Sequence, residues 1–209
     1  MDQRKRKRLI EKWLGESCES LYFKYSGSDY FIRNRENLQD VFFYQQSRTK
    51  GQFYITYGID CPKILNDLRG NEPLCLPETP KLLITKDFSG RLNQGIPYVC
   101  KHEDHIEKSA LKVCEDLKTE AIPWFESHLS ETDVVESYRK SEIRLLEPSQ
   151  DIPPGKILRW TMYGLLLHDI GEPSKASVWL ERALLKWKLI NKPTAQDKEW
   201  VRIIESRMP

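Results

Sequence analysis

The spacing of hydrophobic and polar residues divides the chain into a strand-rich first half and a helical second half. Between Leu21 and Ile59, apolar residues recur at a period near two in four segments, LYFKYS, DYFIRN, DVFFYQQ and QFYITYGI. These segments predict up to four antiparallel strands in a meander. KLLIT at residues 81–85 and GIPYVC at residues 95–100 predict one or two more, and Pro97 favours an edge position for the last.

A period near 3.6 predicts helices on both sides of this region. In residues 5–14, KRKRLIEKWL, four apolar side chains share one helical face, and Gly15 is suited to end that helix. A second apolar stripe runs through residues 103–125, with an interruption expected at Pro123. Ser130 followed by Asp133 has the chemistry of a helix N-terminus, so a further helix is expected to begin there.

Prolines indicate how the chain is organised into domains. EPSQDIPPG, residues 147–155, predicts a linker between a domain at residues 1–146 and a helical extension at residues 156–209. Residues 60–80 carry four more prolines and predict an irregular excursion from the sheet, a kind of segment that often carries function. The predicted fold class is α+β, a mainly antiparallel sheet with packed helices and a C-terminal α-helical extension.

The extension contains one helical hairpin of a recognisable type. Its large, small and turn residues are Trp160, Gly164, Leu167, Gly171, Ala176, Leu180 and Ala183. At these spacings residues 157–190 resemble one tetratricopeptide repeat, in which small residues let two helices approach closely. A third helix is expected near residues 195–206. Because stable arrays need three or more repeats, we expect a docked helical appendage rather than an independent peptide-binding array.

The segment VFFYQQSRTKGQFYITYGI, residues 41–59, predicts a hairpin whose register follows from its turn. With RTKG as the loop, Gly51 takes a positive φ and Ser47 pairs with Gln52. The register then places Phe42 opposite Tyr57, Tyr44 opposite Ile55 and Gln46 opposite Phe53 on the expected core face.

The opposite face of this hairpin is mixed in character. Phe43 pairs with Thr56 and Gln45 with Tyr54, which places aromatic rings beside adaptable polar groups. A covering helix would make this face core, and an open face would suit a protein partner. The candidate partner-binding residues are Phe43, Gln45, Arg48, Lys50, Tyr54 and Thr56. RNA stacking through Phe43 and Tyr54 is a further alternative, but it requires more arginine and lysine than the turn supplies.

Composition and charge narrow the classes of function. The chain has 209 residues, 39% of them apolar and 31% charged, which is typical of a soluble globular protein. Its 33 basic and 31 acidic side chains give a formal net charge of +2, so the chain as a whole has little electrostatic attraction to nucleic acid, and any such binding would have to use a local patch such as residues 4–8. Five scattered cysteines indicate reduced thiols, and no membrane-spanning stretch or signal peptide is recognised. We therefore expect a cytoplasmic protein without a membrane partner.

No motif in the sequence indicates catalysis, a cofactor or a structural metal site. Cys100, His102 and His105 in CKHEDH are suitable zinc ligands by atom type, yet C-x-H-x-x-H is not a usual structural-zinc spacing. Nucleophile elbows and phosphate-binding glycine loops are missing. The enzyme alternative is a nucleic-acid or small-ligand site formed by Arg33, Arg35 and Arg91 with the histidines near residue 102.

A resemblance to a known family adds to this interpretation. The succession SDYFIR, VFFYQQSRTKGQFYITYGI, a proline-rich excursion, RLNQG and IPWFESHLS resembles a bacterial family catalogued as domain of unknown function 4304, over residues 5–145. The positions that carry it are Phe31, Arg33, Gln46, Ser47, Phe53, Gly58, Arg91 and Trp124. The resemblance implies an α+β domain without established catalysis and, by analogy, a role in immunity to a toxin. We therefore expect a non-enzymatic protein-binding module, most concretely a bacterial immunity protein that binds a cognate toxin.

Overall fold

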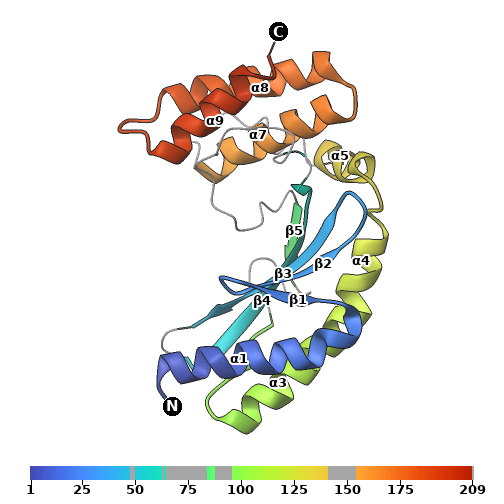
Figure 1. Ribbon diagram of the computed structural model, residues 1–209, viewed down its shortest axis with the longest axis vertical. Coiled ribbons are helices and arrows are strands. Elements are labelled where there is room, and N and C mark those ends of the chain that lie inside the picture. The colour runs from blue at the N-terminus through green and yellow to red at the C-terminus, as the bar shows by residue number, and fades with distance from the viewer. Residues whose placement is uncertain (48–49, 63, 65–83, 88–95, 141–153, 209) are drawn as a thin grey trace. The chain divides into compact units, whose positions relative to one another are not determined.

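The computed structural model describes residues 1–47, 50–62, 64, 84–87, 96–140 and 154–208 (Figure 1). Contacts divide the chain into two compact units, Met1–Asp60 with Thr79–Leu129 and Cys61–Glu78 with Ser130–Pro209. The described part of the first unit holds a β-sheet with its helices, and that of the second is largely helical. The chain is thus an α+β protein with an antiparallel sheet.

The sheet is an antiparallel meander extended at one side. Its strands are β1 (Lys24–Gly27), β2 (Tyr30–Asn34), β3 (Gln39–Gln46), β4 (Gln52–Asp60), β5 (Ile84–Asp87) and β6 (Tyr98–Val99). The order is β1-β2-β3-β4-β5, and the short β6 pairs with the beginning of β4. The four predicted meander strands are confirmed, and β6 pairs only with β4 among the described strands, as expected beside Pro97.

The first helix is longer than the sequence predicts. Helix α1 spans Gln3–Cys18 and is capped by Asp2, whose side chain accepts from the Lys5 backbone N–H at 2.9 Å. The prediction that Gly15 ends this helix is wrong, because Leu14 and Cys18 are both fully buried and their packing holds the last turn together. A short 3₁₀ turn, Glu19–Leu21, then leads into β1.

A bent helix runs through the expected interruption at Pro123. Helix α3 (Glu103–Asp116) continues through a π-helical turn, Leu117–Ala121, into α4 (Ile122–Glu126). Proline is tolerated in the first turn of a helical segment, where its missing N–H is not required. Because the π-helical turn ends at Ala121, Pro123 falls in the first turn of the new helical segment α4, and the chain remains helical.

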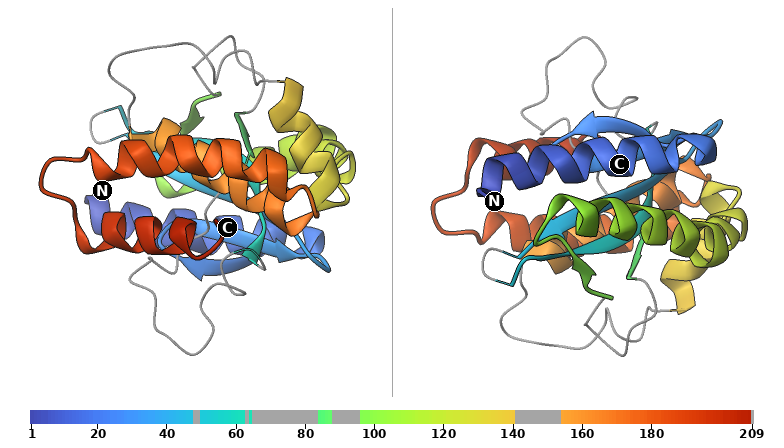
Figure 2. Two further views of the ribbon diagram at one scale, coloured as in Figure 1. Left: turned by 90° about the horizontal axis from the view of Figure 1, so that it is seen from above. Right: turned by 90° about the horizontal axis from the view of Figure 1, so that it is seen from below.

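Helices α1, α3 and α4 cover one face of the sheet (Figures 1 and 2). Phe31 and Phe42 stack on adjacent strands with ring centroids 4.7 Å apart. The ring of Tyr57 contacts Phe125 of α4 at 5.7 Å, and its hydroxyl donates to Glu120 at 3.0 Å. This aromatic core fixes the sheet against the helices and defines which strand positions point away from them.

The second unit contains α5 (Glu131–Lys140), α7 (Pro154–Asp169), α8 (Pro173–Lys188) and α9 (Ala195–Glu205). The expected cap of α5 is present, because Ser130 and Asp133 exchange backbone and side-chain hydrogen bonds of 2.9–3.3 Å. Contacts assign α5 to this unit, whereas the sequence places it in the 1–146 domain. Residues 147–153 of the predicted linker lie outside the described residues, and α7 begins at Pro154.

The α7–α8 pair is closely packed. A Cβ atom built on Gly164 would lie 2.6 Å from Cδ2 and 2.7 Å from Cγ of Leu180, so only glycine fits there without a shift. Gly171 has a φ of +82° in the connection between the helices. The indole N–H of Trp187 donates to the buried Thr161 hydroxyl at 2.9 Å. The close helix approach expected at Gly164 is therefore observed.

Candidate protein-binding face

The β3–β4 hairpin has the predicted register. Phe42 pairs with Tyr57, Tyr44 with Ile55 and Gln46 with Phe53 on the helix-covered face. On the other face Phe43 pairs with Thr56 and Gln45 with Tyr54. The aromatic and β-branched side chains at alternate positions, together with the turn, set this register because a slip of one residue would expose the core.

Burial differs between the two faces. Phe42, Phe53, Ile55 and Tyr57 are buried almost completely against the helices. On the second face Gln45 is exposed, and Phe43, Tyr54 and Thr56 are half-buried. Helices α1, α3 and α4 all lie on the first side, and their side-chain contacts reach the sheet from there (Figure 2). The candidate residues therefore combine aromatic surface with accessible polar groups, which is typical of protein interfaces.

One aromatic residue of this face was missed by the sequence reasoning. Tyr30 of β2 pairs with Phe43, and their ring centroids lie 5.2 Å apart. Burial raises the pKa of the Tyr30 phenol, and the negative charge of Asp29 raises it further. The period-two pattern of DYFIRN assigns Tyr30 to one face of its strand, but only the β2–β3 register shows that this face lies beside Phe43 of the hairpin. The aromatic part of the face thus extends over three strands.

The described residues on either side of the hairpin turn agree with the expected pairing. The Ser47 backbone N–H donates to the Gln52 carbonyl at 2.8 Å, and Gly51 has a φ of +58°. Lys50 is exposed and its backbone N–H donates to the Ser47 hydroxyl at 3.2 Å. The predicted contact residue Arg48 lies outside the described residues. Lys50 therefore supplies a positive charge at the rim of the candidate face.

The arginines of the enzyme alternative have structural partners. Asp40 is completely buried and accepts from Nε of Arg33 at 2.7 Å. Nη2 of Arg35 approaches the other Asp40 oxygen at 2.7 Å, and its Nη1 donates to the carbonyls of Phe125 and His128 at 3.1 and 2.7 Å. Burial lowers the pKa of Arg35. This cluster ties β2 and β3 to the C-terminal end of α4, where cations are favoured.

The histidines near residue 102, His102 and His105, do not join this arginine cluster. Arg33 pairs with Asp40, and Asp40 pairs with Ile59 near the end of β4. His102 follows β6, which pairs with the beginning of β4. Ile59 and Gln52, which pairs with Val99 of β6, are seven positions apart on β4, a distance of about 23 Å along an extended strand. The predicted partner Arg91 lies outside the described residues. The geometry thus does not bring Arg33, Arg35 and His102 into one pocket.

Cys100, His102 and His105 differ in their surroundings. Cys100 is buried and burial raises its pKa, while His102 is exposed and its ring centroid lies 5.2 Å from that of His105, with the ring planes tilted by 56°. Within the described ranges, no three histidine, cysteine or acidic side chains are grouped closely enough to hold a metal ion. The described helices also include none that is long and apolar enough to cross a membrane.

In comparisons with family models, curated proteins and solved structures, no significant match to this chain was found. The resemblance to domain of unknown function 4304 and the tetratricopeptide-like character of residues 157–190 therefore stay predictions. The candidate face rests on the register, burial and chemistry of its own residues.

Proposed function

We propose that this chain is a non-enzymatic protein-binding module and that the face formed by Tyr30, Phe43, Gln45, Tyr54 and Thr56 contacts its partner. The observation that carries this proposal is the half-buried aromatic surface beside an exposed Gln45, on the side of the sheet away from α1, α3 and α4. Aromatic residues surrounded by adaptable polar groups supply much of the binding energy at protein interfaces.

A bacterial immunity protein that binds and neutralises a cognate toxin is the most concrete form of this function. It is supported by analogy with the family that residues 5–145 resemble and by the mixed aromatic and polar chemistry of the candidate face. An immunity protein needs to occlude its target rather than carry out chemistry. An accessible, largely preformed surface is suited to that task.

The test is co-expression with the product of the adjacent open reading frame. We expect the chain to rescue growth from a toxic neighbour and to co-purify with it. Gln45→Arg, which adds a charge at the exposed polar residue of the candidate face, should abolish both effects because an unpaired charge buried in an interface is costly to desolvate. Leu111→Arg is the matched control, since Leu111 is 59% exposed on α3 and lies away from that face.

Three results would contradict the proposal. A neighbour that is harmless and never co-purifies removes the immunity function. Equal loss of binding in Gln45→Arg and Leu111→Arg removes the assignment of the face. Retained binding by a folded Gln45→Arg variant likewise moves the contact elsewhere on the molecule.

A further inference from the structure

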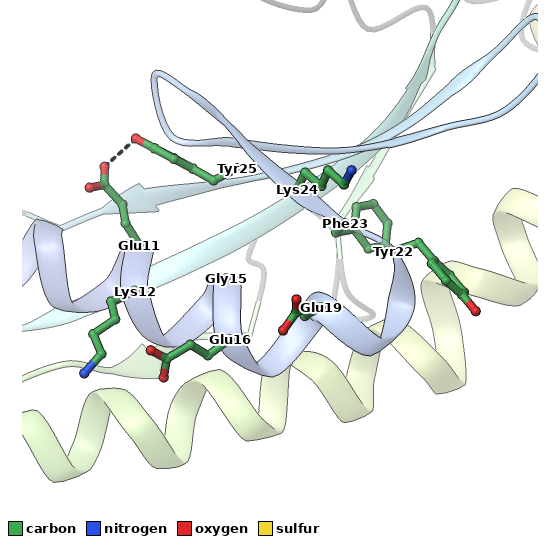
Figure 3. Close-up of a pocket in the computed structure, with 9 residues that line it drawn as sticks. All are labelled: Glu11, Lys12, Gly15, Glu16, Glu19, Tyr22, Phe23, Lys24 and Tyr25. Atoms are coloured by element: carbon green, nitrogen blue, oxygen red, sulfur yellow. Dashed lines mark hydrogen bonds between the residues drawn. The ribbon is translucent and has the colours of Figure 1, made fainter.

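An open pocket of about 730 Å³ lies between α1 and β1 in the first unit (Figure 3). Its lining residues are Glu11, Lys12, Gly15, Glu16, Glu19, Tyr22, Phe23, Lys24 and Tyr25. We refer to this pocket as the α1–β1 groove. Gly15 faces it from the interior of α1, where a Cβ atom would meet only Cε1 of Phe31, at 4.0 Å. Packing therefore does not require glycine here, and its missing side chain leaves space in the groove.

One wall of the groove is an edge strand. Among the described strands β1 pairs only with β2, and the side chains of Lys24, Tyr25 and Ser26 are exposed. The outer side of an edge strand presents backbone N–H and C=O groups that can pair with another extended segment. A peptide added there would direct every second side chain toward α1, and hence into the α1–β1 groove.

The acidic side chains of the groove differ in whether they accept hydrogen bonds from other residues. Glu11 accepts from the hydroxyls of Tyr25 at 2.7 Å and Tyr44 at 3.2 Å, and so belongs to the fold (Figure 3). The carboxylates of Glu16 and Glu19 are exposed and have no hydrogen-bond or ion-pair partner in the described part of the chain. They leave negative charge available for a ligand.

Exposed aromatic rings accompany this charge. Tyr22 is 78% exposed and Tyr25 is 43% exposed. Tyr22 has a φ of +65°, a left-handed conformation in which glycine is usual and an aromatic residue is strained. Arginine and lysine side chains bind favourably to carboxylates and over tyrosine rings. Lys24 also lines the groove, but strand alternation places its side chain on the other side of β1 from that of Tyr25.

We infer that the α1–β1 groove binds an extended peptide segment, which adds as a strand to β1 and places an arginine or lysine side chain between Tyr25 and the carboxylates of Glu16 and Glu19. This surface involves α1 and β1, whereas the proposed function uses the β2–β4 face. The two surfaces are therefore tested by different variants. A negative result for the α1–β1 groove does not contradict the proposed function, and the reverse also holds.

The experiment measures binding of two labelled heptapeptides to the full chain by fluorescence anisotropy at low salt. One has the sequence Thr-Val-Thr-Arg-Thr-Val-Thr, and the other carries glutamate in place of the central arginine. We expect the arginine peptide to bind about tenfold more tightly, because its guanidinium can form charge-assisted hydrogen bonds with the groove carboxylates and the glutamate side chain is repelled by them. Amide NMR shifts should change at Ser26 and Gly27 of β1.

Variants separate the groove from nonspecific attraction. Gly15→Leu keeps a good helix former in α1 but fills the groove, and we expect at least tenfold weaker binding with an unchanged fold by circular dichroism. Gly15→Ala should bind within twofold of the original chain. Glu19→Lys should remove the preference for arginine, whereas Glu107→Lys, on the exposed surface of α3, should retain it.

Several outcomes would overturn this inference. They are equal affinity for the two peptides, absence of binding by either at millimolar concentration, and NMR shifts confined to residues outside α1 and β1. Unchanged binding by folded Gly15→Leu and Glu19→Lys variants would also contradict the inference.

Discussion

Gly164 of α7 lies so close to Leu180 of α8 that a methyl group on Gly164 would meet the leucine side chain at 2.6 Å and its backbone nitrogen at 3.3 Å. Both residues are buried in the second unit. The contact sets how closely the two helices pack, because the atoms that block a larger residue include the branch point of Leu180 as well as its terminal methyl.

Gly164→Ala is expected to destabilise the second unit by about 1–2 kcal/mol, since overpacking costs more than the gain in helix propensity. Tryptophan fluorescence during urea unfolding measures this, because four of the six tryptophans, Trp160, Trp179, Trp187 and Trp200, lie in that unit. Gly15→Ala is the matched control. It lies in a helix with space for a methyl group and should stabilise the first unit by about 0.5–1 kcal/mol. A stabilising Gly164→Ala would contradict the packing.

Removal of the buried carboxylate of Asp40 should be far more damaging than removal of an exposed one. Asp40→Ala leaves the guanidinium groups of Arg33 and Arg35 without their acceptor, and breaking such a pair costs about 3–5 kcal/mol. Glu107→Ala, on the exposed face of α3, should change stability by less than about 0.5 kcal/mol. The free energy of unfolding in urea measures both, and a small effect at Asp40 would show that the cluster does not stabilise the fold.

Acid should weaken the second unit partly through Glu172. Hydrogen bonds from Lys175 and Arg139 hold the pKa of Glu172 below its ordinary value of 4.5. Because the folded pKa is depressed, this carboxylate contributes stability above pH 4.5 that is lost as the pH falls through the folded pKa. Glu172→Gln removes this contribution, so the difference in melting temperature between the two proteins should shrink from pH 7 to pH 3. A difference that stays constant would contradict the assignment.

The described thiols should react slowly in the native protein. Cys18, Cys61, Cys100 and Cys114 are all buried. Burial raises the pKa of Cys18, and the adjacent Cys114 raises it further. In a Cys75→Ser background, a disulfide reagent at pH 8 should label fewer than one thiol rapidly before denaturation and four afterwards. Rapid native labelling of any of the four would show that the core opens readily.

The hairpin shows what the sequence determines locally. Alternating side chains and Gly51 were sufficient to predict the register of β3 and β4, because one residue of slip would bury Gln45 and expose Phe42. The end of α1 was not predictable in this way. Gly15 indicates a helix end by local propensity, but the burial of Cys18 in the next turn outweighs it, and that packing depends on residues distant in sequence.

The candidate site was predictable to a similar extent. Phe43, Gln45, Tyr54 and Thr56 share a face because they share a strand period, whereas Tyr30 joins them through pairing between β2 and β3. The α1–β1 groove was not predicted, because it depends on how an edge strand lies beside a helix. Sequence period identifies neighbours within a strand or helix, and tertiary packing decides which elements form a surface together.

The open edge at β1 also bears on how copies of this protein meet one another. Two copies that paired along β1 would bring their Lys24 ammonium groups near each other on a strand of only four residues. The like charges oppose such pairing, a common protection of edge strands against aggregation. Salt screens this repulsion over about 8 Å at physiological ionic strength. Lys24 therefore makes colloidal stability salt-dependent, and a concentrated solution should self-associate more readily as ionic strength rises.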